Sequence, residues 1–262
     1  MTTKTYRFLV VGAGGVGSWL AEGLVRMLEW RVPGSALIIV DGDSFEAKNK
    51  ERQNFSGSGN KADVLAAQIA PAYPNTFVVP IPQWVVEKAD PQEEAEIQED
   101  GMPAAGKISA VELLDEGDVV YAVVDNFKAR KDICDAARNY DNIDIFLGGN
   151  DENLFGSTYH YRRRDGKDVT DHPSVLHEEY VNPPDRNPGD LSCEERAKID
   201  GGTQLIAANF GVTAYLLGQT QSTIIEDNPI SHGEIYFDLG AGLAQAYDRT
   251  TESINNKTVA TV

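Results

Sequence analysis

Short apolar segments alternate with amphipathic ones along the first 150 residues. Residues 6–11 form an apolar run that is followed at once by glycines, and residues 36–40 form a second run. Between them, residues 16–30 repeat apolar side chains at helical spacing, which predicts a helix. Further strands are expected at residues 76–81, 118–124 and 143–147, and further helices at residues 61–70 and 127–138. This order indicates an α/β fold: a Rossmann-like, doubly wound, mainly parallel sheet with helices on both faces.

The pattern changes after Gly148. Residues 1–150 are expected to form a nucleotide-binding core, and residues 151–262 a C-terminal extension of the same domain. The extension should contain an antiparallel strand, a crossover segment rich in Pro, Asp and His, an apolar helix and an edge strand, at residues 156–162, 165–190, 203–217 and 234–237. The acidic segment 87–106 lacks apolar periodicity, so it is expected to be an exposed insertion.

Charge and cysteine content narrow the class of protein. The 262 residues include 41 acidic and 23 basic side chains, a net charge of −18, which argues against a nucleic-acid partner or an anionic membrane surface. Two cysteines, Cys134 and Cys193, are too few for a disulfide scaffold and favour a reduced, cytoplasmic protein. Cys134 is expected in the core. His172, His177 and Cys193 match no standard metal-ligand spacing. The three tryptophans are expected to be packing residues: Trp19, Trp30 and Trp84.

A glycine-rich turn joins the first strand to the first helix. Gly12, Gly14 and Gly17 have the G-x-G-x-x-G spacing of a nucleotide-binding loop, and Gly15 lies within it. Glycines allow a tight turn and close approach of the backbone to phosphate, while the helix N-terminus favours negative charge. Asp41 ends the second strand, where a carboxylate can bind ribose hydroxyls. These features predict a nucleotide site without specifying the nucleotide.

The long polar loop at residues 42–59 carries candidate phosphate ligands. Asp43, Asn49, Arg52 and Gln53 lie in it, and Lys61 begins the next expected helix. An arginine fork and a lysine beside a glycine loop suit a triphosphate. The alternative is an ordinary solvated loop.

Asp125 and Asn126 lie at the carboxyl end of another expected strand, the usual position for ligands in such sheets. Asp125 could hold Mg²⁺ that bridges phosphate oxygens. Either residue could instead cap the helix that follows, and the two roles are compatible.

In combination, these motifs resemble the ThiF/MoeB/HesA family, relatives of ubiquitin-activating enzymes. The resemblance covers roughly residues 6–150 and includes the further position Arg130 in Asp-Asn-Phe-x-x-Arg. It implies binding of ATP and Mg²⁺, and adenylation of the C-terminal glycine carboxylate of a small ubiquitin-like or sulfur-carrier protein. It also implies that Gly15 approaches the nucleotide, Asp41 holds ribose, Arg52 and Lys61 contact phosphates, and Asp125 acts through Mg²⁺. A homodimer is expected.

Two departures from the family pattern bear on mechanism. Many relatives carry an N-terminal helix that supplies an arginine to the site of a partner subunit. This sequence shows no match to that helix, and Arg7, Arg26 and Arg31 are candidate substitutes for its arginine. Paired Cys-x-x-Cys zinc motifs are also absent. Ser192-Cys193 resembles a segment of ThiF-like proteins associated with PRTRC gene clusters, so Cys193 is a candidate acyl acceptor through a thioester. Buried packing is the alternative role for Cys193.

Two other functions share part of this pattern. A nicotinamide-dependent oxidoreductase would also use the glycine loop and Asp41, although its Tyr-x-x-x-Lys pair is missing and it leaves Arg52 and Lys61 unexplained. A non-catalytic Rossmann module that binds a partner protein would retain the fold without the chemistry.

Overall fold

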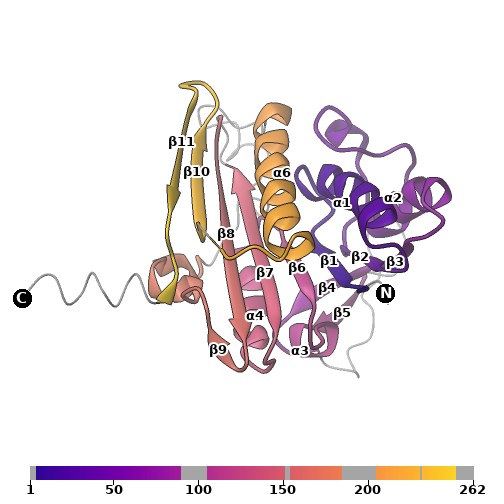
Figure 1. Ribbon diagram of the computed structural model, residues 1–262. Coiled ribbons are helices and arrows are strands. Elements are labelled where there is room, and N and C mark those ends of the chain that lie inside the picture. Colours follow the sequence, from indigo (N-terminus) through magenta and orange to yellow (C-terminus); the bar gives the residue numbers. More distant parts are fainter. Residues whose placement is uncertain (1–3, 90–104, 151–153, 185–204, 231, 252–262) are drawn as a thin grey trace, which may run out of the picture.

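One mixed sheet organises the computed structural model, which describes residues 4–89, 105–150, 154–184, 205–230 and 232–251 (Figure 1). Its nine described strands lie in the order β11-β10-β8-β7-β6-β1-β2-β3, with β9 paired to β8. The strands are β1 Arg7–Val11, β2 Ala36–Val40, β3 Phe77–Ile81, β6 Val119–Ala122, β7 Ile143–Asn150, β8 Phe155–Arg164, β9 Lys167–Asp168, β10 Glu234–Asp238 and β11 Leu243–Tyr247. The pair β4 Gln83–Val86 and β5 Gly106–Ser109 forms a separate small parallel sheet.

The sheet is parallel from β3 through β7 and antiparallel beyond it. β1 pairs in parallel with both β2 and β6, so the strand order changes direction at β1. A crevice forms at such a switch point, outside the carboxyl ends of the strands. β7 continues the parallel part, and β8, β10 and β11 extend the sheet by antiparallel pairing. The predicted Rossmann-like fold, with its antiparallel C-terminal part, is confirmed.

Helices cover both faces of this sheet (Figure 1). Helices α1, α2 and α6 contribute to one buried apolar cluster, and α3 and α4 contribute to the other. Their bounds are α1 Gly17–Arg31, α2 Lys61–Ile69, α3 Ala110–Leu113, α4 Phe127–Ala137 and α6 Ile206–Thr220. Short turns of 3-10 helix occur at Ala47–Asn49, Ala70–Ala72, Pro173–Val175 and Glu178–Tyr180, and a π-helical turn follows α6 at Gln221–Ile225. No helix in the described ranges is long and apolar enough to cross a membrane.

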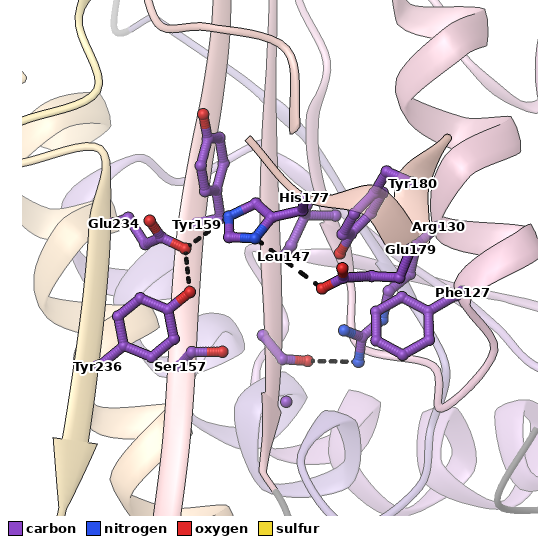
Figure 2. Close-up of a pocket in the computed structure, with 12 residues that line it drawn as sticks. Phe127, Arg130, Leu147, Ser157, Tyr159, His177, Glu179, Tyr180, Glu234 and Tyr236 are labelled. Carbon is purple, nitrogen blue, oxygen red and sulfur yellow. Dashed lines mark hydrogen bonds and ion pairs between the residues drawn. The ribbon is translucent and has the colours of Figure 1, made fainter. Parts of the chain in front are cut away.

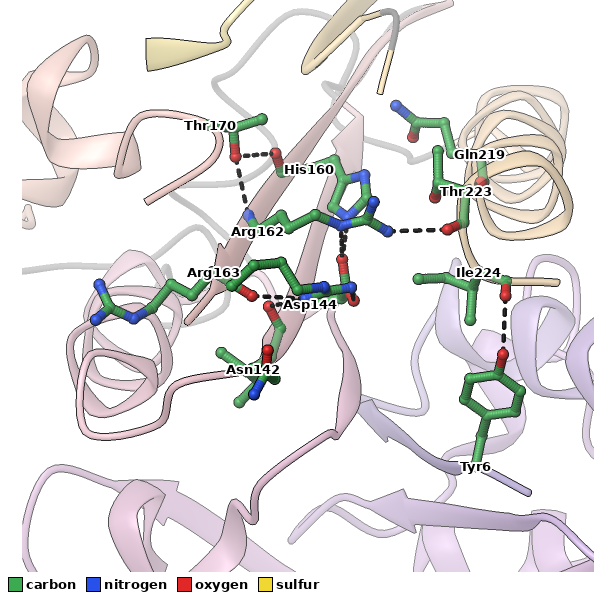
Figure 3. A network of polar contacts seen from close by, with 12 residues as sticks. Tyr6, Asn142, Asp144, His160, Arg162, Arg163, Thr170, Gln219, Thr223 and Ile224 are labelled. Carbon is green, nitrogen blue, oxygen red and sulfur yellow. Dashed lines mark hydrogen bonds and ion pairs between the residues drawn. The ribbon is translucent and has the colours of Figure 1, made fainter. Parts of the chain in front are cut away.

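A buried ionic network ties the antiparallel extension to the parallel core (Figure 3). Asp144 of β7 accepts hydrogen bonds from His160 Nε2 at 2.7 Å and from Arg162 Nε at 2.6 Å, both on β8, and Arg164 pairs with its second oxygen. Arg162 also donates to the carbonyl of Thr223 beyond α6, at 2.9 Å. Hydrogen bonds from His160 and the neighbouring arginines lower the pKa of Asp144 in spite of its burial. The network fixes the β7–β8 register at the amino edge of the parallel strands.

Several expectations about individual segments were wrong or incomplete. Trp30 is not a packing residue: its side chain is 80% exposed at the end of α1. Trp84 is 43% exposed, although its ring packs over Gly42. The sequence pattern also missed β4, β5, α3 and β11. Most of the expected insertion at 87–106, and the end of the crossover segment at 165–190, lie outside the described residues.

Candidate functional site

The glycine loop closes tightly between β1 and α1. Gly12 has φ +97°, and a Cβ there would lie 2.8 Å from Val124 Cγ1. A Cβ on Gly17 would lie 1.7 Å from the Gly12 carbonyl oxygen, so both positions require glycine. Gly14 faces open space instead. The first turn of α1 has neither a side-chain cap nor an acidic residue, which leaves its N–H groups suited to an anion.

Asp41 links this loop to the next one. Its Oδ2 accepts a hydrogen bond from the Ala13 amide at 2.6 Å, and its Oδ1 accepts one from the Asp43 amide at 2.7 Å. Burial raises the pKa of Asp41, while the charge of Lys61 opposes that rise. Lys61 Nζ pairs with Asp43 Oδ2 at 2.7 Å, and the Lys61 side chain is 10% exposed. Asp43 therefore anchors the Lys61 ammonium at the edge of the crevice.

The loop after Asp43 gathers polar atoms that lack partners. Residues 49–53 form a tight turn in which the Arg52 and Gln53 amides donate to the Asn49 carbonyl. Asn49 and Gln53 are buried. Asn49 Oδ1, Arg52 Nε and Gln53 Oε1 are buried without a hydrogen-bond partner anywhere in the described chain. The Arg52 carbonyl is held by Trp19 Nε1 at 3.1 Å and by Asn209 Nδ2 at 3.5 Å.

Of the neighbouring residues Asp125 and Asn126, the second takes the capping role that was expected for either of them. Asn126 caps α4, because its side chain accepts a hydrogen bond from the Ala129 amide at 3.0 Å. Asp125, immediately before it, is exposed beyond the carboxyl end of β6. Since β6 neighbours β1 in the sheet, Asp125 lies at the same edge as the glycine loop. The Asp125 carboxylate therefore takes no part in the cap of α4.

Arg130 joins the carboxyl ends of two strands. Its Nε donates to the Val124 carbonyl at 2.7 Å and its Nη2 to the Gly148 carbonyl at 3.0 Å. The guanidinium lies 5.4 Å from the centre of the Phe127 ring. A Cβ on Gly149 would come within 2.8 Å of Arg130 Nη2, so this strand end makes room for the guanidinium.

A cavity of about 140 Å³ adjoins Arg130 (Figure 2). Its walls come from α4, the end of β7, the segment 177–180, β8 and β10. Charged and aromatic side chains predominate in the lining, among them Arg130, Tyr159, His177, Glu179, Glu234 and Tyr236. The cavity therefore lies at the carboxyl edge of β7, next to the strand end that carries Asp125.

An ion pair forms one wall of the cavity. His177 Nε2 lies 2.8 Å from Glu234 Oε1, and Tyr236 donates to the same oxygen at 2.7 Å. Arg249 holds the other Glu234 oxygen with contacts of 2.8 and 2.6 Å. The hydrogen bond with Glu234 raises the pKa of His177. Burial would raise the pKa of Glu234, but the hydrogen bonds from His177, Tyr236 and Arg249 lower it. Glu179, 3.9 Å from His177 Nδ1, is the less committed carboxylate of this wall.

The other candidate residues lie apart from this edge or outside the described chain. Cys193 falls in the latter group. Cys134 is fully buried, as expected, and burial raises the pKa of its thiol. His172 bonds Ser174 away from the cavity. The described residues contain no cluster of His, Cys, Asp or Glu suited to a metal ion.

The three arginines considered as candidate substitutes, Arg7, Arg26 and Arg31, lie away from the glycine loop and from residues 49–53. Arg7 pairs with Asp118 at 2.6 Å at the amino edge of the sheet. Arg26 pairs with Glu22 on the surface of α1, and Arg31 is exposed at the far end of that helix. None of them extends toward the nucleotide loops of its own chain.

Comparison with known proteins agrees with this arrangement. The ThiF family model matches residues 2–151, and no curated protein matches the sequence. Among solved structures, PaaA is similar with a TM-score of 0.61 and 17% identity, covering 95% of this chain and 65% of that one. E. coli MccB with ATP has a TM-score of 0.60 and 14% identity over the same shares. E. coli TcdA, a tRNA N6-threonylcarbamoyladenosine dehydratase solved with AMP, has a TM-score of 0.51 and 18% identity, covering 83% of this chain and 87% of that one. The chain thus spans 65% of the length of PaaA and of MccB. Because the ThiF family model matches more than half of the chain, the protein belongs to the ThiF family.

Proposed function

We propose that the protein uses ATP to adenylate a carboxylate, namely the C-terminal glycine carboxylate of a small ubiquitin-like or sulfur-carrier protein. The observation that carries this proposal is the placement of two features along one sheet edge. The unpartnered polar atoms of residues 49–53 lie in the loop that follows β2, and the cavity beside Arg130 lies at the end of β7, so both features belong to the carboxyl side of the parallel strands. Activation of a carboxylate needs both features, one for ATP and one for the acyl group.

The first half of the edge fits ATP. A buried polar atom without a partner costs about 1–3 kcal/mol, and residues 49–53 carry three such atoms, which a bound nucleotide would satisfy. The uncapped first turn of α1 and the open space at Gly14 favour phosphate at the glycine loop. MccB has been solved with AMPCPP and MccA together, which supports the same ligand class here.

Each predicted nucleotide ligand has a role consistent with its position. Asp41 uses one acceptor site on each oxygen for backbone amides and retains others for ribose hydroxyls. Lys61 keeps two ammonium donors beyond its bond with Asp43, and with Arg52 it would contact phosphates. Asp125 is the exposed carboxylate that would hold Mg²⁺ against phosphate oxygens.

The chemistry follows from these charges. A substrate carboxylate oxygen attacks the α-phosphorus, a new C–O–P linkage forms, and the bond to the β-phosphate oxygen breaks to release pyrophosphate. The nucleophile is already ionised, so the chain supplies charge stabilisation and no strong base. The cations of Arg52 and Lys61 would reduce the repulsion between the approaching anions.

The cavity offers a cation to an incoming carboxylate. Arg130 lines it, and a guanidinium pairs well with a carboxylate. A glycine terminus carries no side chain beside its carboxylate, so it can approach such a group closely, which supports the glycine carboxylate of a carrier protein as substrate. Residues 1–150 would then bind nucleotide while the extension at 151–262 receives the carrier.

Cys193 would act after adenylation. We propose that its thiolate attacks the adenylated carbonyl, forming a thioester and releasing AMP. The family motif around Ser192 supports this step. The low cysteine content also supports a cytoplasmic location, where such a thiol stays reduced.

ATP–pyrophosphate exchange with a carrier protein that ends in glycine tests the proposal. We expect exchange that needs ATP, Mg²⁺ and the free carboxylate, and none with the amidated carrier. In parallel, ATP with Mg²⁺ should raise the melting temperature more than NAD does, because a ligand that binds the folded state stabilises it. Stabilisation by NAD alone would favour an oxidoreductase. Absent exchange in a folded protein with every glycine-ending carrier encoded near its gene would favour a non-catalytic module.

A further inference from the structure

A histidine and a glutamate form an oriented pair in the cavity at the end of β7. His177 Nε2 lies 2.8 Å from Glu234 Oε1, and Figure 2 shows the His177 ring between Glu234 and Glu179. In spite of burial, hydrogen bonds from His177, Tyr236 and Arg249 lower the pKa of the Glu234 carboxyl group. An ionised carboxylate only accepts hydrogen bonds, so Nε2 of the neutral imidazole carries the proton. Its Nδ1 is then an acceptor with a lone pair.

Aromatic rings hold the imidazole in this orientation. The Tyr159 ring lies edge-on to the His177 ring at 5.8 Å, and the Tyr180 ring lies at 6.3 Å, centre to centre. The Tyr159 hydroxyl is itself held by a backbone carbonyl at 2.8 Å. One imidazole nitrogen is therefore committed to Glu234, and the other is directed toward Glu179.

Glu179 provides a second acceptor beside the first. Its Oε1 lies 3.9 Å from His177 Nδ1, which is too far for a direct hydrogen bond. Two acceptors at this separation can both receive hydrogen bonds from one nitrogen, at an ordinary distance of about 2.9 Å. Arg249 balances the charge of Glu234, whereas Glu179 forms no ion pair with a lysine or arginine among the described residues. The two acceptors therefore suit a group that brings several donors and a positive charge.

A primary ammonium is such a group. It carries three donors, and carboxylates and aromatic faces both attract it. Tyr159, Tyr180 and Tyr236 line the same cavity. A thiol acceptor would react as an anion, which the neighbouring carboxylates disfavour. We propose that the cavity binds a primary amine at His177 and Glu179, and that this amine receives the activated carboxylate as an amide. The inference rests on the proposed adenylation, which supplies the activated carbonyl.

The transfer step balances with His177 as the base. The ammonium first loses one proton to water, and the amine nitrogen then attacks the carbonyl carbon of the adenylate. A C–N bond forms, the bond between the carbonyl carbon and the phosphate oxygen breaks, and AMP leaves. A second proton passes from the nitrogen to His177 Nδ1, and the ionised Glu234 stabilises the resulting imidazolium through Nε2. A thioester would react in the same way and release its thiol.

Proton NMR of the His177 ring in the full chain tests the ammonium site without ATP. Nα-acetyl-lysine amide should shift the ring signals saturably, whereas Nα-acetyl-norleucine amide, which lacks the ammonium, should not. Glu179→Gln should weaken binding of the lysine probe by at least ~10-fold, the scale for losing a charged hydrogen-bond partner. Glu178→Gln is the matched control: Glu178 is exposed on the same turn outside the cavity lining, so this variant should bind the probe like the wild type.

Amide formation tests the catalytic step. With a carrier that ends in glycine, ATP, Mg²⁺ and the lysine probe, intact mass should show a carrier–lysine amide that resists reductant. His177→Gln should lower amide formation by at least ~100-fold relative to pyrophosphate exchange in the same preparation, the scale of a lost general base. Wild-type transfer should also rise with pH through the pKa of His177, and the variant should lack this rise. The hydrogen bond with Glu234 and the charge of Glu179 raise that pKa, while burial and Arg249 lower it.

The possible results separate the ammonium site, the base and adenylation. Equal shifts with the norleucine probe, or unchanged binding in Glu179→Gln, would overturn the ammonium site; Glu179 is 40% exposed, so this variant stays informative if His177→Gln unfolds. Exchange without amide at saturating probe would overturn the transfer and leave adenylation standing. Amide formation with the wild-type pH profile in His177→Gln would remove His177 as the base. Probe binding through Glu179 without exchange would refute adenylation, and the transfer with it, while the ammonium site would stand.

Discussion

Lys61→Met separates a structural role of this residue from a role in phosphate binding. The substitution keeps most of the side-chain volume and removes the ammonium that lies 2.7 Å from Asp43. Asp43 is 49% exposed at its side chain, so water can solvate its carboxylate once the partner is gone. The loss of stability should therefore be near that of a surface pair, about 1 kcal/mol. For a chain of this size that corresponds to a fall of roughly 2–4 °C in melting temperature.

The expected effect on activity is much larger. An ammonium placed to contact phosphate contributes about 3 kcal/mol to the stabilisation of developing charge, which corresponds to a ~100-fold loss of exchange rate. The folded fraction cannot produce that loss, because a change of about 1 kcal/mol leaves a domain with typical stability almost fully folded. ATP–pyrophosphate exchange and thermal unfolding, measured on the same preparation, give the two numbers.

Lys131→Met is the matched control. Lys131 pairs with Asp135 at 2.5 Å on α4, so the change removes the same kind of ion pair away from the crevice. We expect a similar small effect on melting and unchanged exchange. If Lys61→Met retained exchange within about threefold of the wild type, Lys61 would be only the partner of Asp43, and the proposed phosphate contact would be wrong.

Three further results are expected. Asp125→Ala should abolish exchange with almost no change in melting temperature, because Asp125 is exposed; exchange near the wild-type level would remove it as a metal ligand. His177 has a raised pKa through Glu234, so the stability of this pair is present below about pH 6.5 and lost as pH rises through the folded-state value. Urea unfolding of His177→Gln should therefore show a smaller fall in stability toward alkaline pH, and a fall equal to that of the wild type would contradict this. In intact-mass measurements with carrier and ATP, Cys193→Ala should lose a thiol-sensitive adduct that the wild type forms, and an adduct that persists would exclude this acceptor.

The positions of the proposed nucleotide ligands could be predicted because these residues follow strand ends. Apolar runs at residues 6–11 and 36–40 locate β1 and β2, and parallel pairing then brings whatever follows them to one edge. The position of Asn126 directly before an expected helix also predicted a possible capping role, and the structure confirms that role. That Lys61 would pair with Asp43 was not predicted, since both were expected to be nucleotide ligands and the spacing gives no partner.

The cavity could not be predicted from the sequence pattern. Its wall joins His177, Glu234 and Tyr236, which come from a 3-10 turn and an antiparallel strand more than fifty residues apart. No local period links such positions, because tertiary packing alone brings them together. The prediction for Trp30 was wrong for a different reason. Residue type predicts burial, but Trp30 lies at the end of α1, where its ring is 80% exposed among the described residues.

The acidic charge of the protein and its proposed binding of anions are compatible because the backbone contributes positive potential at one edge. Helices α1, α2 and α4 follow the carboxyl ends of strands β1, β2 and β6 in the chain, so their N-termini lie along that edge. Each N-terminus carries about half a positive charge. Arg52, Lys61 and Arg130 add full charges there, while Asp118 and Asp144 are compensated by arginines at the amino edge. The net charge of −18 repels polyanions, although salt screens this repulsion beyond about 8 Å. A small anion that reaches the crevice meets fixed dipoles and cations instead, and salt screens these much less.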